Sequence, residues 1–169
     1  LGAPSESRAV TDEVTTAVDR GIVVVAAAGN AGTDGGPEYP AALLTTEVLA
    51  VGATDANDAP ADFSSRYPEV DLSAPGVNVA SAFPRGAQGV KSQYARWSGA
   101  SMATPWVAGA AALLLDFDDQ LGPAVVAQRL VDTAVRFDPS IVGMGSGRLD
   151  VAAAIDCPEG TGKKGKRKR

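Results

Sequence analysis

The sequence predicts an α/β fold in which parallel strands are covered by helices. One observation is the apolar, β-branched run Ile22–Ala28, which is typical of a parallel strand buried on both faces. A second is the preceding segment, residues 5–20, where Val10, Val14 and Val18 recur at helical spacing between charged residues. A helix followed by a buried strand forms half of a β–α–β unit, and this pairing predicts the fold class.

The remaining elements are expected in a regular order along the chain. Gly21 is expected to end the first helix, and Gly29 with Asn30 to end the first strand. Further strands are expected at Val48–Thr54, Asp71–Pro75 and Val77–Ala82, and further helices from near Ser101 to Phe117, at Pro123–Thr133 and at Leu149–Ile155. Residues 84–96 are expected to form a loop.

Length and composition fit one domain of residues 1–157 with an aliphatic core. The chain has 169 residues, of which 45% are hydrophobic but only 5% aromatic. Cys157 is the single cysteine, which excludes a disulfide framework. No apolar run approaches the roughly 20 residues that cross a bilayer, so no transmembrane segment is expected. No signal peptide is evident in the sequence.

Charge is distributed unevenly along the sequence. The net charge is −5, although residues 163–169 carry six lysines and arginines. The body is therefore more acidic than the whole chain, which argues against a nucleic-acid partner. Residues 158–169 contain almost no apolar side chain to bury, and we expect them to form a disordered basic tail.

Residues 98–115 are the most informative segment for chemistry. They begin Ser-Gly-Ala-Ser-Met-Ala-Thr-Pro and place Ser101 at the start of an apolar, Ala-rich helix. A helix N-terminus presents free N–H groups and partial positive charge, so it favours negative charge developing nearby. Pro105 is expected in the first turn, where its missing N–H is harmless. A serine hydroxyl needs a base to become a strong nucleophile, and the sequence contains no histidine.

The segment Ser101–Pro105, with Val107–Ala110 behind it, resembles the nucleophile segment of the subtilisin-like serine peptidases, the subtilases. Seven further blocks follow the order of that family and span nearly all of residues 1–155: Leu1–Ser5, Val23–Asn30, Tyr39–Ala41, Val51–Thr54, Phe63–Ser65, Ala74–Gly76 and Gly145–Asp150. A lone serine motif would be weak evidence, whereas ordered blocks are specific.

The resemblance implies a three-layer fold, with a mostly parallel sheet between helices on both faces. It also implies that this subtilisin-like domain is incomplete, because the family's triad runs Asp, His, Ser and only the serine is present. The missing N-terminal half of the domain is then a partner of this chain. We expect the chain alone to be inactive and to aggregate through an open sheet edge. The parent protein is expected to be secreted and to act on peptides or proteins.

Site residues are assigned by the same resemblance. Ser101 is the expected nucleophile, and the Asn30 side-chain amide, with the Ser101 backbone N–H, is the expected oxyanion donor. Three groups are expected to bind substrate: Leu1, Gly2 and Ala3 along its backbone, and Ala27, Ala28 and Gly29 with Pro40 and Ala41 as walls of the pocket for the residue before the cleaved bond. These small walls leave room for a large apolar side chain.

Other interpretations remain open at this point. Ser101 could be an ordinary helix-capping serine and Asn30 an ordinary turn residue. The whole chain could belong to a peptide-binding pseudoenzyme that lacks catalysis. An α/β-hydrolase esterase is disfavoured, because no apolar strand leads to Ser101 and no histidine follows it.

No cofactor or metal is expected. Subtilases often bind Ca²⁺, and two acidic turns stand out at residues 55–58 and 116–119. Neither turn has the spacing of a calcium loop, with its glycine and terminal glutamate. We interpret both turns as solvated surface.

Overall fold

The computed structural model describes residues 2–44, 47–84 and 93–156. The expected basic tail, Cys157 and Leu1 lie outside the described residues. The main sheet is parallel, in the order β1-β2-β3, and a separate antiparallel pair joins β4 to β5. The strands are β1 (Val24–Ala27), β2 (Val48–Thr54), β3 (Leu72–Pro75), β4 (Val79–Ala82) and β5 (Tyr94–Trp97).

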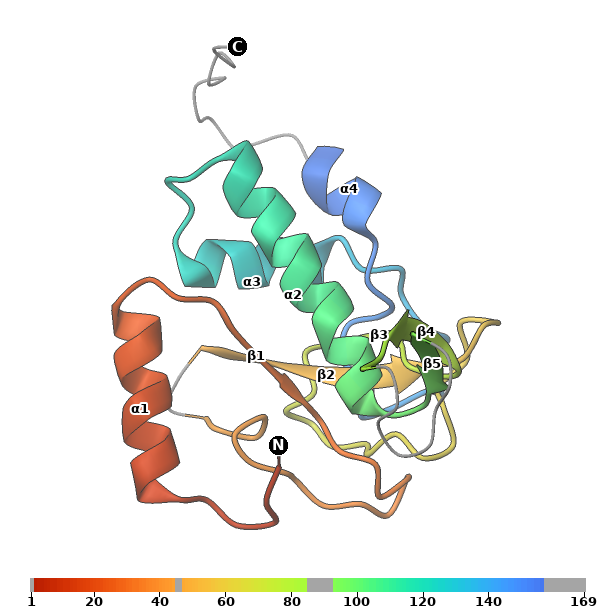
Figure 1. Cartoon of the computed structure of the whole chain (residues 1–169). Coiled ribbons are helices and arrows are strands. Elements are labelled where there is room, and N and C mark those ends of the chain that lie inside the picture. The colour runs from red at the N-terminus through yellow and green to blue at the C-terminus, as the bar shows by residue number, and fades with distance from the viewer. Residues whose placement is uncertain (1, 45–46, 85–92, 157–169) are drawn as a thin grey trace.

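Helices cover both faces of the main sheet, as Figure 1 shows. On one side lies α1 (Arg8–Asp19), and on the other lie α2 (Ala100–Phe117), α3 (Pro123–Asp132) and α4 (Val151–Asp156). The predicted three-layer α/β architecture with a parallel sheet is therefore confirmed. Gly21 ends the first helix as expected, and its φ of +80° is one that glycine adopts readily.

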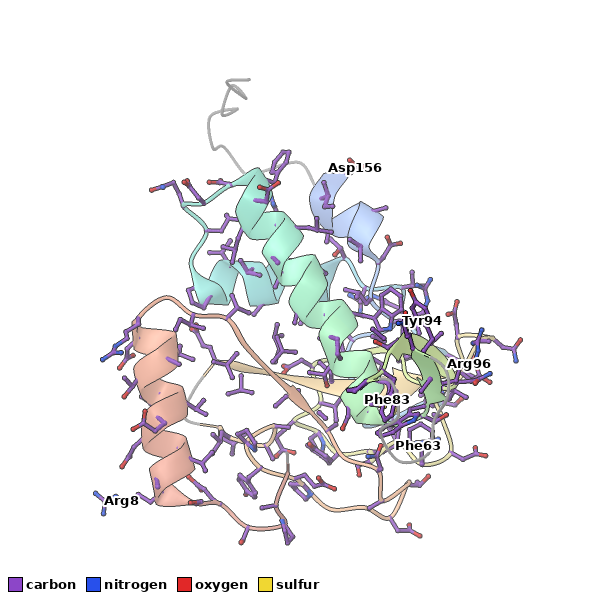
Figure 2. The ribbon with its side chains drawn as sticks, in the orientation of Figure 1. Arg8, Phe63, Phe83, Tyr94, Arg96 and Asp156 are labelled. Carbon is purple, nitrogen blue, oxygen red and sulfur yellow. The ribbon has the colours of Figure 1, made fainter. Side chains whose placement is uncertain are left out.

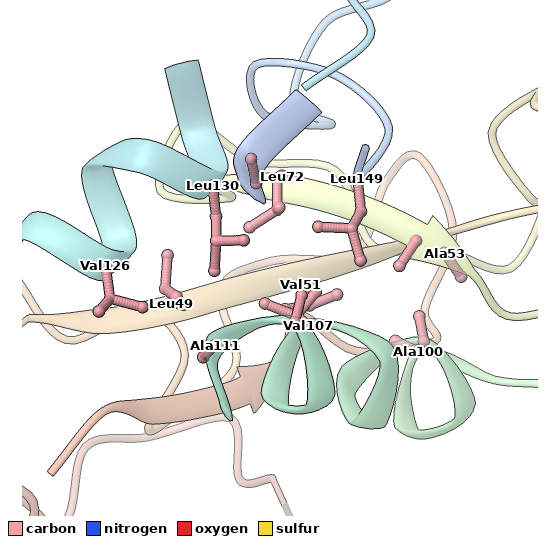
Figure 3. Close-up of a cluster of buried hydrophobic side chains, with 14 of the residues drawn as sticks. Leu49, Val51, Ala53, Leu72, Ala100, Val107, Ala111, Val126, Leu130 and Leu149 are labelled. Carbon is pink, nitrogen blue, oxygen red and sulfur yellow. The ribbon is translucent and has the colours of Figure 1, made fainter. Parts of the chain in front are cut away.

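The core forms around β2, all seven residues of which are buried. Successive side chains along a strand point to opposite faces of the sheet. Leu49 and Val51 therefore pack with Val107 of α2, in the cluster drawn in Figure 3. Val48, on the opposite face, belongs to a second cluster to which Val14 of α1 contributes. A strand buried on both faces holds the helix that carries Ser101 against the sheet.

The first strand is less buried than the sequence predicts. Among the residues of β1, only Ala26 is buried, and Ile22 just before the strand is 53% exposed. The physical reason is that β1 lies at the edge of the sheet: within the described ranges its hydrogen-bonded neighbour is β2. An apolar run indicates a strand, but it does not show how many neighbours the strand has.

The expected loop at 84–96 is wrong at its end, because Tyr94–Trp97 forms β5. Its backbone pairs with β4, and the Phe83 and Trp97 ring centroids lie 5.4 Å apart. Figure 2 shows Phe83, Tyr94 and Arg96 gathered at this strand pair. Most side chains of β5 are exposed, so the strand lacks the buried apolar pattern on which the sequence interpretation relied.

Pro105 does not lie in the first turn of its helix. Because α2 begins at Ala100, Pro105 falls in the second turn and cannot donate a hydrogen bond to the Ser101 carbonyl. Within the described part of the chain, α2 is also the one helix long and apolar enough to cross a membrane by length and composition. A helix packed on a parallel sheet passes the same test, so this is weak evidence for a membrane span.

Asp71 precedes β3 and gives a pH-dependent prediction. Its Oδ2 accepts a hydrogen bond from the Ala50 N–H at 2.7 Å, while burial raises the pKa of its carboxyl. The folded state then binds the Asp71 proton more tightly than the unfolded state. The contribution of Asp71 to the free energy of unfolding therefore falls as pH rises from the pKa of this carboxyl in the unfolded state to its higher pKa in the folded state.

Replacing Asp71 with Asn keeps an oxygen acceptor for Ala50 and removes the buried charge. We expect Asp71→Asn to raise the melting temperature near about pH 7 and to leave it unchanged near about pH 3, where the acid is neutral in both states. Thermal unfolding followed by circular dichroism measures this. The exposed Asp62→Asn serves as control, and an equal shift for both variants at both pH values would contradict the prediction.

Candidate active site

Ser101 lies at the N-terminus of α2 with its side chain exposed. The first N–H groups of a helix have no partner inside it. Here the Ala100 N–H is taken by the Asn30 side chain and the Met102 N–H by the Gly99 carbonyl, at 2.8 and 2.9 Å. Among the described residues no acceptor is found for the Ser101 N–H. This donor therefore stays free beside the Ser101 hydroxyl.

Asn30 follows β1 and reaches the same helix terminus. Its Oδ1 accepts the Ala100 N–H at 2.8 Å, which fixes the direction of the side-chain amide. Its Nδ2 group then remains as a donor and has no acceptor in the part of the chain that the structure describes. The sequence-predicted pair, Asn30 and Ser101, is thus brought together from segments far apart in the chain. The Asn30 amide and the Ser101 N–H lie at the same helix terminus as the Ser101 hydroxyl, and these groups are suited to binding a developing oxyanion.

The predicted pocket walls divide into buried and partly exposed residues. Ala28 and Ala41 are 0% and 3% exposed, so their side chains pack in the core. Ala27 and Pro40 remain partly exposed. Gly29 has a φ of +113°, and its carbonyl accepts a hydrogen bond from the Ser65 N–H at 3.1 Å. Surface that a bound molecule could touch is therefore offered by Ala27 and Pro40 rather than by the two buried alanines.

The N-terminal segment lies beside the same loop. Ala3 and Tyr39 form an antiparallel bridge, with N–H to carbonyl distances of 3.0 Å from Ala3 and 2.9 Å from Tyr39. Gly2 and Ala3 are exposed, and Leu1 lies outside the described residues. This bridge places the predicted backbone-binding segment next to Pro40, and it unites two of the three predicted substrate-binding groups.

Tyr67 is a residue of this region that the sequence analysis did not identify. Its hydroxyl donates a hydrogen bond to the Ala28 carbonyl at 3.0 Å. Burial is the main cause that raises the pKa of Tyr67 to about 12, so the phenol is neutral near neutral pH. No sequence signal marks this role, because it depends on a contact between segments distant in the chain.

Glu38 is the second residue that the sequence analysis did not identify. Its carboxylate lies against both Gly2 and Gly29: a Cβ added to either glycine would collide with it. A signal was present in the sequence, since Glu38 is the only charged residue within 35–46 and directly precedes the block Tyr39–Ala41.

The acidic side chains of the turn at residues 55–58 are engaged in local contacts. Asp55 accepts the N–H groups of Asn57 and Ala59 at 2.8 and 2.9 Å, and these hydrogen bonds lower the pKa of its carboxyl. Asp58 forms an ion pair with Arg148 at 2.9 Å. In the described ranges, no group of three or more His, Cys, Asp or Glu side chains is arranged to hold a metal ion.

Comparison with known proteins places this geometry in context. The family described as the Subtilase family matches residues 1–162. Subtilisin DY of Bacillus licheniformis is 43% identical over 157 residues, which cover 91% of this chain and 54% of that protein. Subtilisin E of Bacillus subtilis (strain 168) is also 43% identical, over 91% of this chain and 39% of that protein.

The solved structures agree with the sequence matches. A solved structure of a protease from Pseudoalteromonas arctica PAMC 21717 is similar with a TM-score of 0.84 and 30% identity, over 93% of this chain and 49% of that chain. The chain thus spans about half the length, or less, of these relatives.

Proposed function

The chain belongs to the subtilase family, and from this premise we propose that it forms the nucleophile-bearing part of a serine endopeptidase. The observation that best supports this proposal is the hydrogen bond of 2.8 Å between the Ala100 N–H and Asn30 Oδ1. It directs the remaining amide donor of Asn30 to the helix terminus where Ser101 stands. A free hydroxyl and two N–H donors at one helix terminus are the groups that acyl transfer by a serine requires.

The chemistry assigned to these residues is acyl transfer. The Ser101 hydroxyl attacks the peptide carbonyl, and the Asn30 amide with the Ser101 N–H binds the oxygen as it becomes negative. A base must take the hydroxyl proton and return it to the leaving amine. Because this sequence contains no histidine, we assign the base and its orienting aspartate to a segment outside it. That segment is then an obligatory partner of this chain.

The substrate in this proposal is an extended peptide. The N–H and carbonyl of Ala3 are both paired with Tyr39, whereas the exposed backbone of Gly2 has no such partner among the described residues, and a substrate strand can add there by β-augmentation. Pairing through the main chain tolerates many sequences, which suits an endopeptidase. The named relatives are subtilisins, and a secreted parent protein acting on peptides or proteins follows from that likeness.

The absence of histidine also favours a second candidate, a subtilase-like protein that binds peptides without cleaving them. The two candidates differ in whether Ser101 is activated. A fluorophosphonate probe reacts with activated serines, so it separates them directly. We expect Ser101 to be labelled in the whole protein that contains this chain, and the 169-residue chain alone to remain unlabelled.

Peptide mass mapping after labelling identifies the modified residue. The Ser101→Ala variant of the whole protein should take up no probe, and Ser98→Ala should be labelled like the unmodified protein. Absence of labelling in the whole protein, with peptide binding retained, would support the pseudoenzyme. Labelling of the isolated chain at Ser101 would show that a base exists within it.

A further inference from the structure

Resting on the proposed function, we propose that Glu38 selects substrates with lysine or arginine immediately before the cleaved bond. The carboxylate of Glu38 lies where the two segments assigned to substrate binding meet. A substrate cation placed there would pair with it. Glu38 is thus a specificity-determining residue rather than a catalytic one.

The carboxylate of Glu38 lies against two glycines. A Cβ built on Gly29 would come within 2.6 Å of Glu38 Cδ, and a Cβ built on Gly2 would collide with Glu38 Oε2. The two carboxylate oxygens therefore point toward different segments, one on each side. In this position the charge occupies space that a side chain at either residue would need.

The carboxylate has no partner of its own among the described residues. The ion pairs found there join Arg8 to Asp12 and Arg148 to Asp58, and no side-chain hydrogen bond reaches the Glu38 carboxylate. Glu38 is nevertheless only partly exposed. A partly desolvated carboxylate without a counter-charge is a favourable place for a cation, because pairing offsets the desolvation that folding has already imposed.

The backbone holds Glu38 firmly in this place. Its carbonyl accepts the Ala42 N–H at 2.9 Å. The next residue, Tyr39, is held by the bridge to Ala3. The charge is therefore presented by an anchored segment rather than by a freely moving loop, which reduces the entropy lost when a ligand binds.

The neighbouring surface suits the stem of a long basic side chain. Ala27 and Pro40 are partly exposed and apolar, and Gly29 has no side chain. The aliphatic part of lysine or arginine can lie along such a surface while its charged end reaches a carboxylate. The small pocket walls alone predict a preference for a large apolar side chain, whereas the carboxylate of Glu38 adds a negative charge beside them.

The test uses the whole protein and four peptide substrates that differ only at the residue before the cleaved bond: Lys, Arg, Leu or Phe. We expect Lys and Arg to give the higher kcat/KM. Glu38→Gln keeps the size of the side chain and removes its charge. This variant should lower kcat/KM about 30-fold for the Lys and Arg peptides, which is the size expected for the loss of a charged hydrogen bond. For the Leu and Phe peptides, kcat/KM should change by less than about threefold.

Asp34→Asn is the matched control, because it removes one negative charge from an exposed position in the same loop. It should leave the ratio of basic to apolar substrates unchanged. An equal loss of kcat/KM on all four peptides after Glu38→Gln would show a structural role and overturn the proposal. A preference for Leu or Phe in the unmodified protein would overturn it as well.

A binding measurement separates this proposal from the failure of the proposed function. Fluorescent p-aminobenzamidine carries a planar cation, and its binding needs no turnover. If no peptide is cleaved but the probe binds and Glu38→Gln weakens it at least tenfold, the peptidase assignment fails and the cation site stands. Probe affinity that is the same with and without the Glu38 charge overturns the cation site, whether or not peptides are cleaved.

Discussion

Replacing Asn30 with Ala in the whole protein is expected to lower kcat by about 10²–10³-fold with little change in KM. That size comes from removal of one such donor in a subtilisin and is not a product of this geometry. The physical reason is that an amide donor aimed at the oxyanion acts on the transition state far more than on bound substrate. Steady-state kinetics with a single chromogenic peptide measures both constants.

A second variant distinguishes the role of the Asn30 side-chain oxygen from that of its NH₂ group. Asn30→Asp keeps an oxygen that can accept the Ala100 N–H, but it replaces the amide donor with a negatively charged oxygen. If the donor carries the effect, Asp should be at least as damaging to kcat as Ala. Asn57→Ala, in an exposed turn, is the control. An unchanged kcat in Asn30→Ala would remove Asn30 from the oxyanion site.

Replacing Gly145 with Ala is expected to destabilise the whole protein by about 3 kcal/mol or more. Gly145 has a φ of +78°, which an L side chain rarely adopts. An added Cβ would also collide with the backbone carbonyl of Asp71 and with the Leu72 N–H group. These are backbone atoms at the start of β3, so relieving the collision means displacing a strand of the main sheet. Urea unfolding measures the loss.

Gly36 offers the matched control for this substitution. A Cβ built there meets nothing within 4 Å, and its φ does not lie in the left-handed region. Gly36→Ala should therefore change the free energy of unfolding by less than about 1 kcal/mol, in either direction. If Gly145→Ala were equally mild, the C-terminal turn would be free to move away from Asp71, contrary to the tight contact seen here.

The parts of the fold that the sequence predicted are those in which local pattern and tertiary environment agree. Val48–Thr54 is apolar throughout because both of its faces are covered, and it was predicted with the correct ends. Pro123–Asp132 was recognised because its apolar residues recur at helical spacing. By contrast, β5 is stabilised mainly by pairing with β4, and its exposed side chains give no periodic signal.

The candidate site shows the same division. Ser101 and Asn30 were predicted because each lies within a block whose residue order is distinctive, and the structure brings the two side chains to one helix terminus. Glu38 was not predicted, because the role that we propose for it depends on its position between Gly2 and Gly29. That position depends on how three separate segments meet, which no local pattern contains.

The hydrogen bond from the Tyr67 hydroxyl to the Ala28 carbonyl depends on the protonation of the phenol at high pH. With a pKa of about 12 in the folded state, the phenol keeps its proton after tyrosines in an unfolded chain have lost theirs. The contact beside β1 therefore persists in strongly basic solution. Because the folded state keeps the Tyr67 proton that the unfolded state loses, the free energy of unfolding falls as pH rises above about 10. In alkali, we therefore expect this contact to be lost together with the unfolding of the chain and not before it.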